Sequence, residues 1–371
     1  MRYKFSDLYY DDTKNAKKLK SSEYKSIGKY IIVDQGKSLI AGYTDNEDGL
    51  YTDVPAIIFG DHTRNIKYIN SPFFLGADGT KVLKSSLKNV NYKYLYYLLK
   101  NASIPDTGYN RHYKWLKELM FKYHSQDQQN QIVTILDKVD LTISKYREEL
   151  LFLDELVKAR FVEMFGDPMI NPYEWKVINI SEVLRAKASN GFFSRRDDYC
   201  DDGNVEVLGV ANVVNRMYSQ VVDLPRTNAN EKDIEKFEVK YGDMLFCRSS
   251  LVAEGIGKAS IIPEGVQTNI LFECHVIRLP LDLDKCVPEF LQTLSTTKFF
   301  RNQIISKSKT ATMTTIGQDG ILKTNIILPP LEKQKEYYDF VKQIDKSRSR
   351  IQKSLEASQE LFDSLMQEYF G

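Results

Sequence analysis

The sequence has 371 residues, of which 42% are hydrophobic and 27% are charged, and its formal net charge at pH 7 is +1. The length predicts two or more domains, and the small net charge means that any nucleic-acid-binding surface must be a local one. The four cysteines form no C-x-x-C pair and the four histidines show no metal-ligand spacing, so the sequence predicts neither a zinc ribbon nor a disulfide framework. No apolar leader and no run of about 18 apolar residues occurs, so the sequence predicts no membrane span. Together these features predict a cytoplasmic protein.

Residues 1–124 are predicted to form a first globular domain. Short apolar segments are separated by turn residues, which is typical of strands. The segments are 30–33, 55–59, 72–75 and 82–83, followed by a short predicted helix at 92–99, a polar loop at 104–112 and a last apolar segment at 119–121.

Residues 125–166 are predicted to form a long helix. Its apolar residues step by four and three in alternation, which is the heptad pattern of a coiled coil. They are Ile132, Leu136, Val139, Ile143, Tyr146, Leu150, Leu153 and Val157. Gly166, with Pro168 close behind it, is a stop signal, and the helix should be about 55–60 Å long.

Residues 167–329 repeat the plan of the first domain. Predicted strands lie at 205–208, 243–246, 259–262 and 275–278, followed by a short helix at 289–300, a polar Lys/Thr loop at 306–315 and a strand ending at 326–328. By this interpretation the first domain is about forty residues shorter, and it lacks a counterpart of the start at Trp175.

Residues 330–371 are predicted to form a second long helix that duplicates the first. At an offset of 205 residues, and without a gap, Gln129 aligns with Gln334 and Phe165-Gly166 aligns with Phe370-Gly371. Such a long period indicates a duplicated unit rather than a solenoid. We expect the two apolar stripes to bury each other; the alternative is that each packs on its neighbouring globular domain.

Several segments resemble the specificity subunit of type I restriction–modification systems, over nearly the whole chain. The most specific are the entry to the second long helix, Pro329–Gln334, and the exit from the first, Phe161–Pro168. Gly28–Arg64, Gly76–Gly79 and Gly108–Tyr113 resemble one recurring class of that family's target recognition domain.

The resemblance implies an α+β fold with two mixed globular DNA-recognition domains, separated by two long antiparallel coiled-coil helices and related by a pseudo-two-fold repeat. It divides the chain into a shortened recognition domain (1–124), a central spacer helix (125–166), a second recognition domain (167–329) and a C-terminal spacer helix (330–371). The entry to the first long helix, at residues 124–129, departs from the family pattern because it lacks the prolines.

The resemblance also implies a function. Each domain would read half of a bipartite site in double-stranded DNA, while the paired helices would set the gap and dock methylation subunits, expected to be two. Restriction subunits would join through the complex. The chain itself would be non-catalytic and without a cofactor, because S-adenosylmethionine would be bound by the methylation subunit.

DNA contacts require hydrogen-bond donors on loops: Lys, Arg, Ser or Thr for phosphates, and Arg, Asn or Gln for base edges. The alternative for each candidate is a solvated or salt-bridged loop residue, and Asp61 is a candidate to orient Arg64. The candidates are Lys37, His62, Arg64, Tyr109, Arg111 and His112 in the first domain, and Arg195, Arg196, Arg248, Ser249, Lys307, Lys309 and Thr312 in the second.

The sequence leaves two other classes of function to consider, a scaffold and an enzyme. A helical scaffold or adaptor that no longer reads DNA is the alternative favoured by the shortened first domain. A self-contained enzyme is disfavoured: Asn171-Pro172-Tyr173 lacks one proline of the N-P-P-Y motif of adenine methyltransferases, and Asp167…Glu174-Trp175-Lys176, which resembles a nuclease motif, lies in the same linker. Gly255-Ile256-Gly257-Lys258 lacks the spacing of a phosphate-binding loop.

Overall fold

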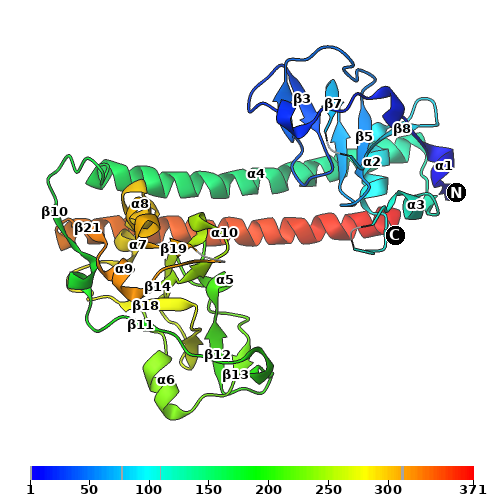
Figure 1. Cartoon of the computed structure of the whole chain (residues 1–371). Helices are drawn as coiled ribbons and strands as arrows, with labels where there is room; N and C mark the ends of the chain where they lie inside the picture. Colours follow the sequence, from blue (N-terminus) through cyan, green and yellow to red (C-terminus); the bar gives the residue numbers. More distant parts are fainter. Residues whose placement is uncertain (1, 77, 109, 311–312) are drawn as a thin grey trace. The chain divides into compact units, whose positions relative to one another are not determined.

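The chain folds into two compact units, and each unit combines a globular domain with one stretch of each long helix (Figure 1). The computed structural model describes residues 2–76, 78–108, 110–310 and 313–371. Unit 1 comprises residues 1–148 and 352–371, and unit 2 comprises residues 149–351. Both boundaries therefore fall inside the long helices.

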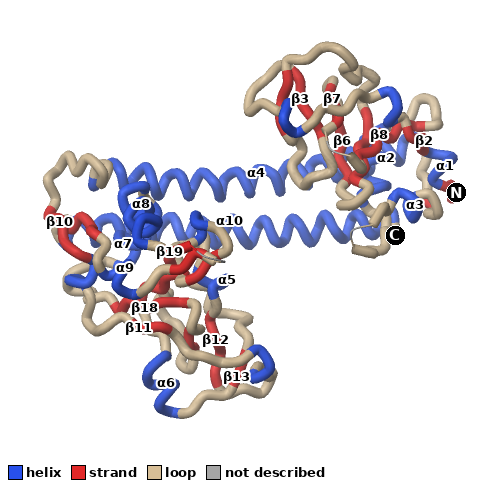
Figure 2. The backbone as a smooth tube through the Cα atoms, in the orientation of Figure 1, coloured by secondary structure: helices blue, strands red, loops and turns tan. Residues whose placement is uncertain are grey.

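The described part of unit 1 contains three sheets (strands red in Figure 2). An antiparallel sheet consists, in order, of β2 (Tyr9–Asp11), β8 (Thr80–Ser85), β5 (Ala56–Gly60) and β6 (Ile66–Ile69). A second sheet consists of β4 (Gly42–Thr44), β3 (Tyr30–Val33) and β7 (Phe73–Leu75), and a third of β1 (Arg2–Lys4) and β9 (Met120–Lys122). The helical segments are α1 (Phe5–Leu8), η1 (Thr13–Asn15), η2 (Ser21–Glu23), α2 (Tyr92–Lys100) and α3 (Tyr113–Leu116).

Unit 2 has four sheets in its described residues. The first sheet consists, in order, of β11 (Ser189–Asn190), β18 (Val276–Pro280), β14 (Asp243–Cys247) and β16 (Ala259–Ile261). The second sheet consists of β13 (Arg226–Thr227), β12 (Val205–Leu208) and β17 (Ile270–Phe272). The third sheet consists of β10 (Lys176–Asn179) and β21 (Asn325–Leu328), and the fourth of β15 (Ser249–Ser250), β20 (Thr314–Thr315) and β19 (Lys309–Thr310). The helical segments are η3 (Ile180–Val183), η4 (Arg196–Asp198), α5 (Val210–Val213), α6 (Glu231–Phe237), η5 (Ala253–Gly255), α7 (Pro288–Thr296), α8 (Lys298–Lys307) and α9 (Gln318–Leu322).

The first three sheets of unit 2 repeat those of unit 1 strand for strand. In both units a central strand, β5 or β14, pairs antiparallel with two neighbours, and the strand that opens the second sheet, β3 or β12, pairs parallel with β7 or β17. A parallel pair within otherwise antiparallel sheets is a distinctive feature, so finding it at the same place in both units confirms the predicted internal repeat. The sheet β15–β20–β19 and helices α8 and α9 account for much of the extra length of unit 2.

We expected the first domain to lack a counterpart of the segment that starts at Trp175. This expectation is wrong for β10, the strand that follows Trp175, because β1 is its counterpart in unit 1. Strand β1 pairs antiparallel with β9 just as β10 pairs with β21. In both units a short helical segment comes next, and its third residue accepts a hydrogen bond from the backbone N–H of the residue preceding the segment: Asp7 from Lys4 and Glu182 from Asn179.

The predicted short helix at 289–300 is in fact two helices. Helix α7 ends at Thr296, and Thr297 then caps α8, because its side chain accepts a hydrogen bond from the N–H of Phe300 at 3.4 Å. The predicted polar loop at 306–315 contains the end of α8 and the strands β19 and β20. The other predicted strands of both domains lie within a residue or two of the observed ones.

The two long helices are α4 (Gln126–Phe165) and α10 (Leu331–Phe370). Each has 40 residues, and their first and last residues differ by the predicted offset of 205. Within each unit the two helical stretches pack antiparallel. In unit 2, Asp154 pairs with Arg348 at 2.6 Å; in unit 1, Arg147 donates to Gln359 at 3.3 Å.

The helix ends show why the repeated residues matter. Gly166 has φ +76° and donates its N–H to the carbonyl of Val162, which ends α4 as predicted. Gln129 and Gln334 are both buried, and each donates its side-chain amide to a backbone carbonyl five residues earlier, at 2.9 and 2.8 Å. At the entry of α4, where prolines are lacking, the backbone N–H of Ser125 donates to the side chain of Gln128.

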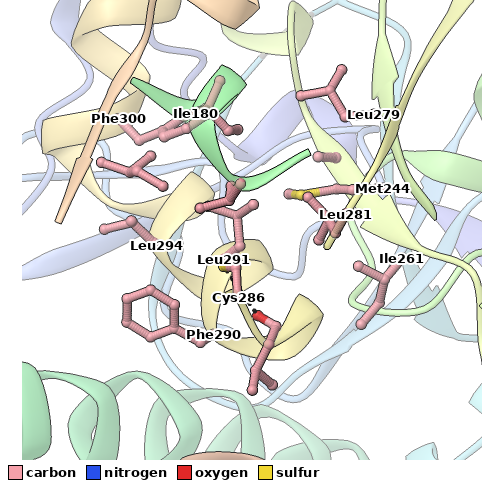
Figure 3. Packing of buried hydrophobic residues seen from close by; sticks show 14 of the residues in the cluster. Ile180, Met244, Ile261, Leu279, Leu281, Cys286, Phe290, Leu291, Leu294 and Phe300 are labelled. Atoms are coloured by element: carbon pink, nitrogen blue, oxygen red, sulfur yellow. Dashed lines mark hydrogen bonds between the residues drawn. The ribbon is translucent and has the colours of Figure 1, made fainter. Parts of the chain in front are cut away.

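The stripes on α4 and α10 bury each other and also join the cores of the globular domains, so both sequence interpretations hold. In unit 2, Phe161 and Phe165 of α4 pack against Tyr337 of α10 and Phe290 of α7, with ring centroids 4.8–5.7 Å apart. Figure 3 shows the same cluster continuing through Met244 and Leu279 into the sheet. Aromatic contacts in this range add about 0.5–1.5 kcal/mol each to the burial itself.

Candidate nucleic-acid interface

Four connections meet at one end of the sheets of unit 1, and we call their contacting residues 34–37, 61–65, 78–79 and 104–108 the first loop cluster. These connections follow β3, β5, β7 and α2 in the chain. The gathering is local to unit 1 and brings together segments that are up to about seventy residues apart in sequence. Loops placed on a rigid sheet in this way are typical of binding sites.

Gln35 joins three of these connections. Its side-chain amide donates to the carbonyl of Asp78 at 2.9 Å, and its Oε1 accepts from the N–H of His62 at 3.2 Å. Its backbone carbonyl accepts from the Thr63 hydroxyl at 2.6 Å and from the Asn65 amide at 2.9 Å. A side chain with this many partners fixes the relative positions of the loops it joins.

Two glycines permit this close packing. A Cβ added to Gly60 would lie 2.2 Å from Oγ1 of Thr63, and one added to Gly79, where φ is +81°, would lie 2.6 Å from the His62 ring. Any larger residue would therefore force these loops apart.

His112 was expected at the DNA surface, and this expectation is wrong because the residue is completely buried. Its Nδ1 lies 3.0 Å from the carbonyl of Asp61, and its Nε2 lies 3.3 Å from the Thr107 hydroxyl. The Asp61 carboxylate, also buried, accepts the backbone N–H of Tyr113 at 2.7 Å. Both residues therefore hold the start of α3 against the loop that follows β5.

Arg64 lies in the cluster, but Asp61 does not orient it. Its Nη2 pairs with Asp106 at 2.6 Å and its Nη1 donates to the carbonyl of Ile104 at 3.2 Å. The N–H of Gly108 and the guanidinium of Arg64 both lower the pKa of the Asp106 carboxyl. About one third of the Arg64 side chain remains exposed, which leaves a face of the guanidinium open to an acceptor.

Three other candidates of unit 1 have mixed placements. Lys37 and Arg111 are exposed, whereas His62 is half-buried against Gly79. The charge of Arg111 helps Lys18 to lower the pKa of Asp78, which places Arg111 beside the cluster. Tyr109 lies outside the described residues.

The equivalent connections of unit 2 form a second loop cluster, made of residues 209–210, 248–250, 273–275 and 314–316. Here Glu273 accepts the N–H of Val210 at 2.8 Å. Arg248 is tied down through its backbone, which donates to His275 at 2.9 Å and accepts from Ile316 at 3.0 Å, while its Nη1 donates to the carbonyl of Cys274 at 3.4 Å. Ser249 lies next to it in β15 and pairs with Thr315 of β20.

The remaining candidates of unit 2 are not all brought together. Lys309 is exposed on β19. Lys307 donates to the carbonyl of Lys323 at 2.6 Å, and burial lowers its pKa, so it serves the C-terminal end of α9. Arg195 and Arg196 are exposed at η4, which packs on β13 at the end of β12 opposite to Glu273. Thr312 lies outside the described residues.

The sequence interpretation missed the residues that build the two clusters. Gln35 joins three connections and Glu273 joins two, yet neither is a cation and neither was a candidate. The sequence signal for Gln35 was its place in the run Asp34-Gln35-Gly36, directly after a predicted strand. What the clusters offer chemically is a set of exposed or half-exposed donors on loops held by internal hydrogen bonds, which suits the reading of a polar, anionic surface.

Other kinds of site find little support among the described residues. No group of three or more His, Cys, Asp or Glu side chains there is arranged to hold a metal ion. All four cysteines are free. None of the described helices is both long enough and apolar enough to cross a bilayer. The linker residues Asp167 and Asn171 hold backbone N–H groups of Met169 and Trp175, which is a structural role.

Comparison with known proteins gives consistent matches. The family model described as the type I restriction modification DNA specificity domain matches residues 172–359, just over half of the chain. The type I restriction enzyme MjaVIII specificity subunit of Methanocaldococcus jannaschii is 23% identical over 300 residues, covering 73% of this chain and 69% of its own length. The EcoKI specificity subunit of Escherichia coli is 26% identical over 138 residues, covering 36% of this chain and 29% of its own length.

Two solved structures share the fold. One is the S subunit of a type I restriction–modification system from M. genitalium, with a TM-score of 0.59 and 14% identity, covering 100% of this chain and 96% of that one. The other, from work on complex assembly and conformational transition of the type I system, has a TM-score of 0.51 and 12% identity, covering 99% and 96%. Both likenesses bear on the fold alone.

Proposed function

This chain belongs to the family of type I restriction–modification DNA specificity subunits, and we propose that each of its two loop clusters reads one half of a bipartite DNA site. The chain is a DNA sequence-recognition subunit. The observation that carries the proposal is the repeated convergence: the connections after β3, β5 and β7 in unit 1, and after β12, β14 and β17 in unit 2, meet at equivalent places on equivalent sheets.

The clusters suit base reading because hydrogen bonds within the protein fix the positions of their donor side chains. A base-reading side chain must keep a defined position, since each good bidentate contact discriminates by about 1–3 kcal/mol. Arg64 and Arg248 are half-exposed and each is held by hydrogen bonds. We therefore assign them to base edges, and the exposed Lys37, Arg111 and Lys309 to phosphates.

The long helices are proposed to set the distance between the half-sites. Each runs for 40 residues without a break and takes part in the cores of both units. A helix of that length spans about 60 Å, and DNA advances about 34 Å per turn, so a pair of such helices is long enough to bridge more than one turn.

The methylation subunits, proposed to be two, dock on the long helices. In unit 2, α4 exposes four large apolar side chains on one side: Leu151, Phe152, Leu156 and Val162, between 46% and 66% exposed. Large exposed apolar residues grouped in this way mark protein–protein contacts. Restriction subunits then join through the assembled complex.

The chain itself is proposed to carry no catalysis and no cofactor. The residues that resembled enzyme motifs hold the turn between α4 and β10 instead. Incubation of the purified chain with DNA and either S-adenosylmethionine or magnesium should give no turnover. Adenine methylation should occur only when the methylation subunits and S-adenosylmethionine are added.

The adaptor alternative is not favoured, because both units keep the full framework of sheets and loop clusters. A binding experiment separates the two functions. The chain assembled with its methylation subunits should bind a duplex containing its methylated site more tightly than a scrambled duplex, by roughly a thousandfold or more at physiological salt. Equal affinity for both duplexes across a salt series would support the adaptor and overturn the proposal.

A further inference from the structure

Unit 2 contains a cavity of about 920 Å³, and no residue of the second loop cluster lines it. Its floor is apolar: Val157 and Phe161 of α4, Val341 and Ile344 of α10, and Met217 from the connection between β12 and β13. All of its lining residues belong to unit 2. The volume is that of a pocket able to take several side chains.

The rim of this cavity is cationic. Five cations and two carboxylates line it. Three of the cations, Arg216, Lys258 and Arg301, have no carboxylate within 4.0 Å among the described residues, whereas Arg348 and Lys158 pair with Asp154 and Glu155. The three form the side of the rim that the globular domain contributes.

Their hydrogen bonds go only to neutral groups. Arg216 donates to the Gln220 side chain at 3.0 Å, and Lys258 donates to Oδ1 of Asn215 at 2.6 Å. Arg301 donates Nη2 to the carbonyls of Glu254 and Ile256 at 3.1 and 2.6 Å, while its buried Nη1 has no partner in the described part of the chain. These contacts position the side chains and leave their positive charges uncompensated.

The cavity's shape favours a peptide over DNA. Phosphate binding to a duplex needs cations that project from a convex or grooved surface, since the backbone cannot enter a pocket with an apolar floor. An amphipathic segment can place apolar side chains on the half-buried Met217 and Ile344, and its carboxylates on Arg216 and Lys258. The cavity also shares Val162 with the exposed apolar face of α4.

We propose that this cavity receives an acidic, amphipathic segment of the methylation subunit, whose apolar side chains occupy the floor and whose carboxylates pair with Arg216, Lys258 and Arg301. This inference rests on the proposed function, because it names the chemistry of the partner that docks on the helices. The pairing lies at a rim, so it should govern the rate and the salt dependence of assembly.

The test measures assembly of the full chain with the purified methylation subunit of the same system. The double variant Arg216→Glu and Lys258→Glu reverses the charge of two rim residues. Arg301 is left unchanged because it binds the carbonyls of Glu254 and Ile256. Met217→Trp narrows the cavity without changing charge. Lys232→Glu, on the exposed face of α6, is the control for a charge reversal away from the cavity, with half the charge change of the double variant. Thermal unfolding of each variant checks the fold.

We expect the double variant to assemble at least tenfold more weakly, with a flatter salt dependence, and Met217→Trp to assemble more weakly at every salt concentration. Lys232→Glu should behave as the unmodified chain. At saturating methylation subunit, the affinity of every variant for the specific duplex should stay within about twofold of the unmodified chain.

Three results would overturn the inference. If the rim variants assemble normally while the unmodified complex still discriminates its site, the inference fails and the proposed function stands. If assembly is unchanged but affinity for both specific and scrambled DNA falls, the cations serve DNA phosphates. If the unmodified chain neither assembles nor discriminates, the proposed function fails and the inference fails with it.

Discussion

The two units share a framework of sheets but use charge differently in their loop clusters. In unit 1 the cluster is closed by internal pairing: Arg64 is bound to Asp106, and Gln35 joins three connections. In unit 2, the side chain of Arg248 bonds only to the carbonyl of Cys274, and the extra sheet β15–β20–β19 packs beside it. The framework therefore positions the connections, while the residues within the connections decide what each unit can read.

A second difference lies where the globular domains meet the helices. The second residue of α2 is Lys93, which pairs with Asp137 of α4 at 2.7 Å. The second residue of α7 is Glu289, and the position of α10 that matches Asp137 at the repeat offset is Lys342. The charges are exchanged, but Glu289 is buried with only the Tyr218 hydroxyl as its side-chain partner, at 3.2 Å, among the described residues.

The largest expected effect is on the core that joins α7 to the long helices. Phe290→Ala removes a fully buried ring that touches Phe161 and Phe165 and should lower the free energy of unfolding by about 3–5 kcal/mol. Tyr94→Ala is the matched variant in unit 1, where Tyr94 packs against Phe370. Hydrogen exchange should locate the greatest loss of protection in the altered unit, and an equal loss in both units would contradict the division into two.

The next largest effect is on the pH dependence of stability, and it distinguishes the buried Glu289 of α7 from Lys93 of α2. Burial raises the pKa of Glu289 to about 7 from its ordinary value of 4.5. A raised carboxyl pKa means that the folded state holds the proton more tightly, so stability falls as pH rises from about 4.5 to 7. Glu289→Gln should remove this slope and exceed the unmodified chain in stability at pH 8, by on the order of 3 kcal/mol.

Lys93→Gln is the comparison for Glu289→Gln. The pair that it breaks is about one third exposed on each side, so the cost should be below about 1 kcal/mol and should fall with added salt. Denaturant unfolding between pH 4 and pH 8 measures both variants. An unchanged pH profile in Glu289→Gln would show that this carboxyl is not the group that titrates.

The arginines of the two clusters should give a smaller effect, seen in DNA binding. Arg64→Ala and Arg248→Ala should each weaken binding to the specific site by about 1–3 kcal/mol and change binding to random DNA little. Asp106→Asn keeps the guanidinium of Arg64 but frees it from its ion pair, and it should reduce discrimination less than Arg64→Ala. Equal losses on specific and random DNA would reassign both arginines to phosphates.

The smallest effect on DNA binding is expected for Arg111, whose neighbour His112 is buried and should affect stability instead. Arg111→Ala removes an exposed cation and should reduce the salt slope of binding by about one unit without changing stability. His112→Ala leaves buried partners unsatisfied and should instead cost about 1–3 kcal/mol of stability. If His112→Ala altered the salt slope and left stability unchanged, its assignment to a structural role would be wrong.

Much of the framework was predictable, because periodicity and repetition are visible in one dimension. The repeat offset of 205 residues was predicted correctly, the predicted ends of both long helices lie one residue from the observed ends, and the apolar segments predicted most central strands. The edge strands β2, β4 and β6 were missed because they are short and only partly apolar. Thr297 interrupts a helical pattern with a single cap, which periodicity does not reveal.

The site was less predictable, because residue type does not determine burial. His112 and Arg111 are adjacent polar residues in one loop, yet one is buried and the other exposed. Lys307 has the composition of a DNA contact but serves a helix end. Gln35 works through its backbone and side chain together, and only the convergence of three connections shows its role.

The central claim, that each unit reads its own half-site, is tested most directly by exchanging residues 175–329 for the equivalent domain of a relative and mapping methylated adenines across the genome of cells that carry the exchanged chain. Because unit 1 and its loop cluster are untouched, we predict that the first half of the methylated site stays the same while the second half becomes that of the relative. A site whose second half is unchanged, or whose two halves change together, would contradict the account.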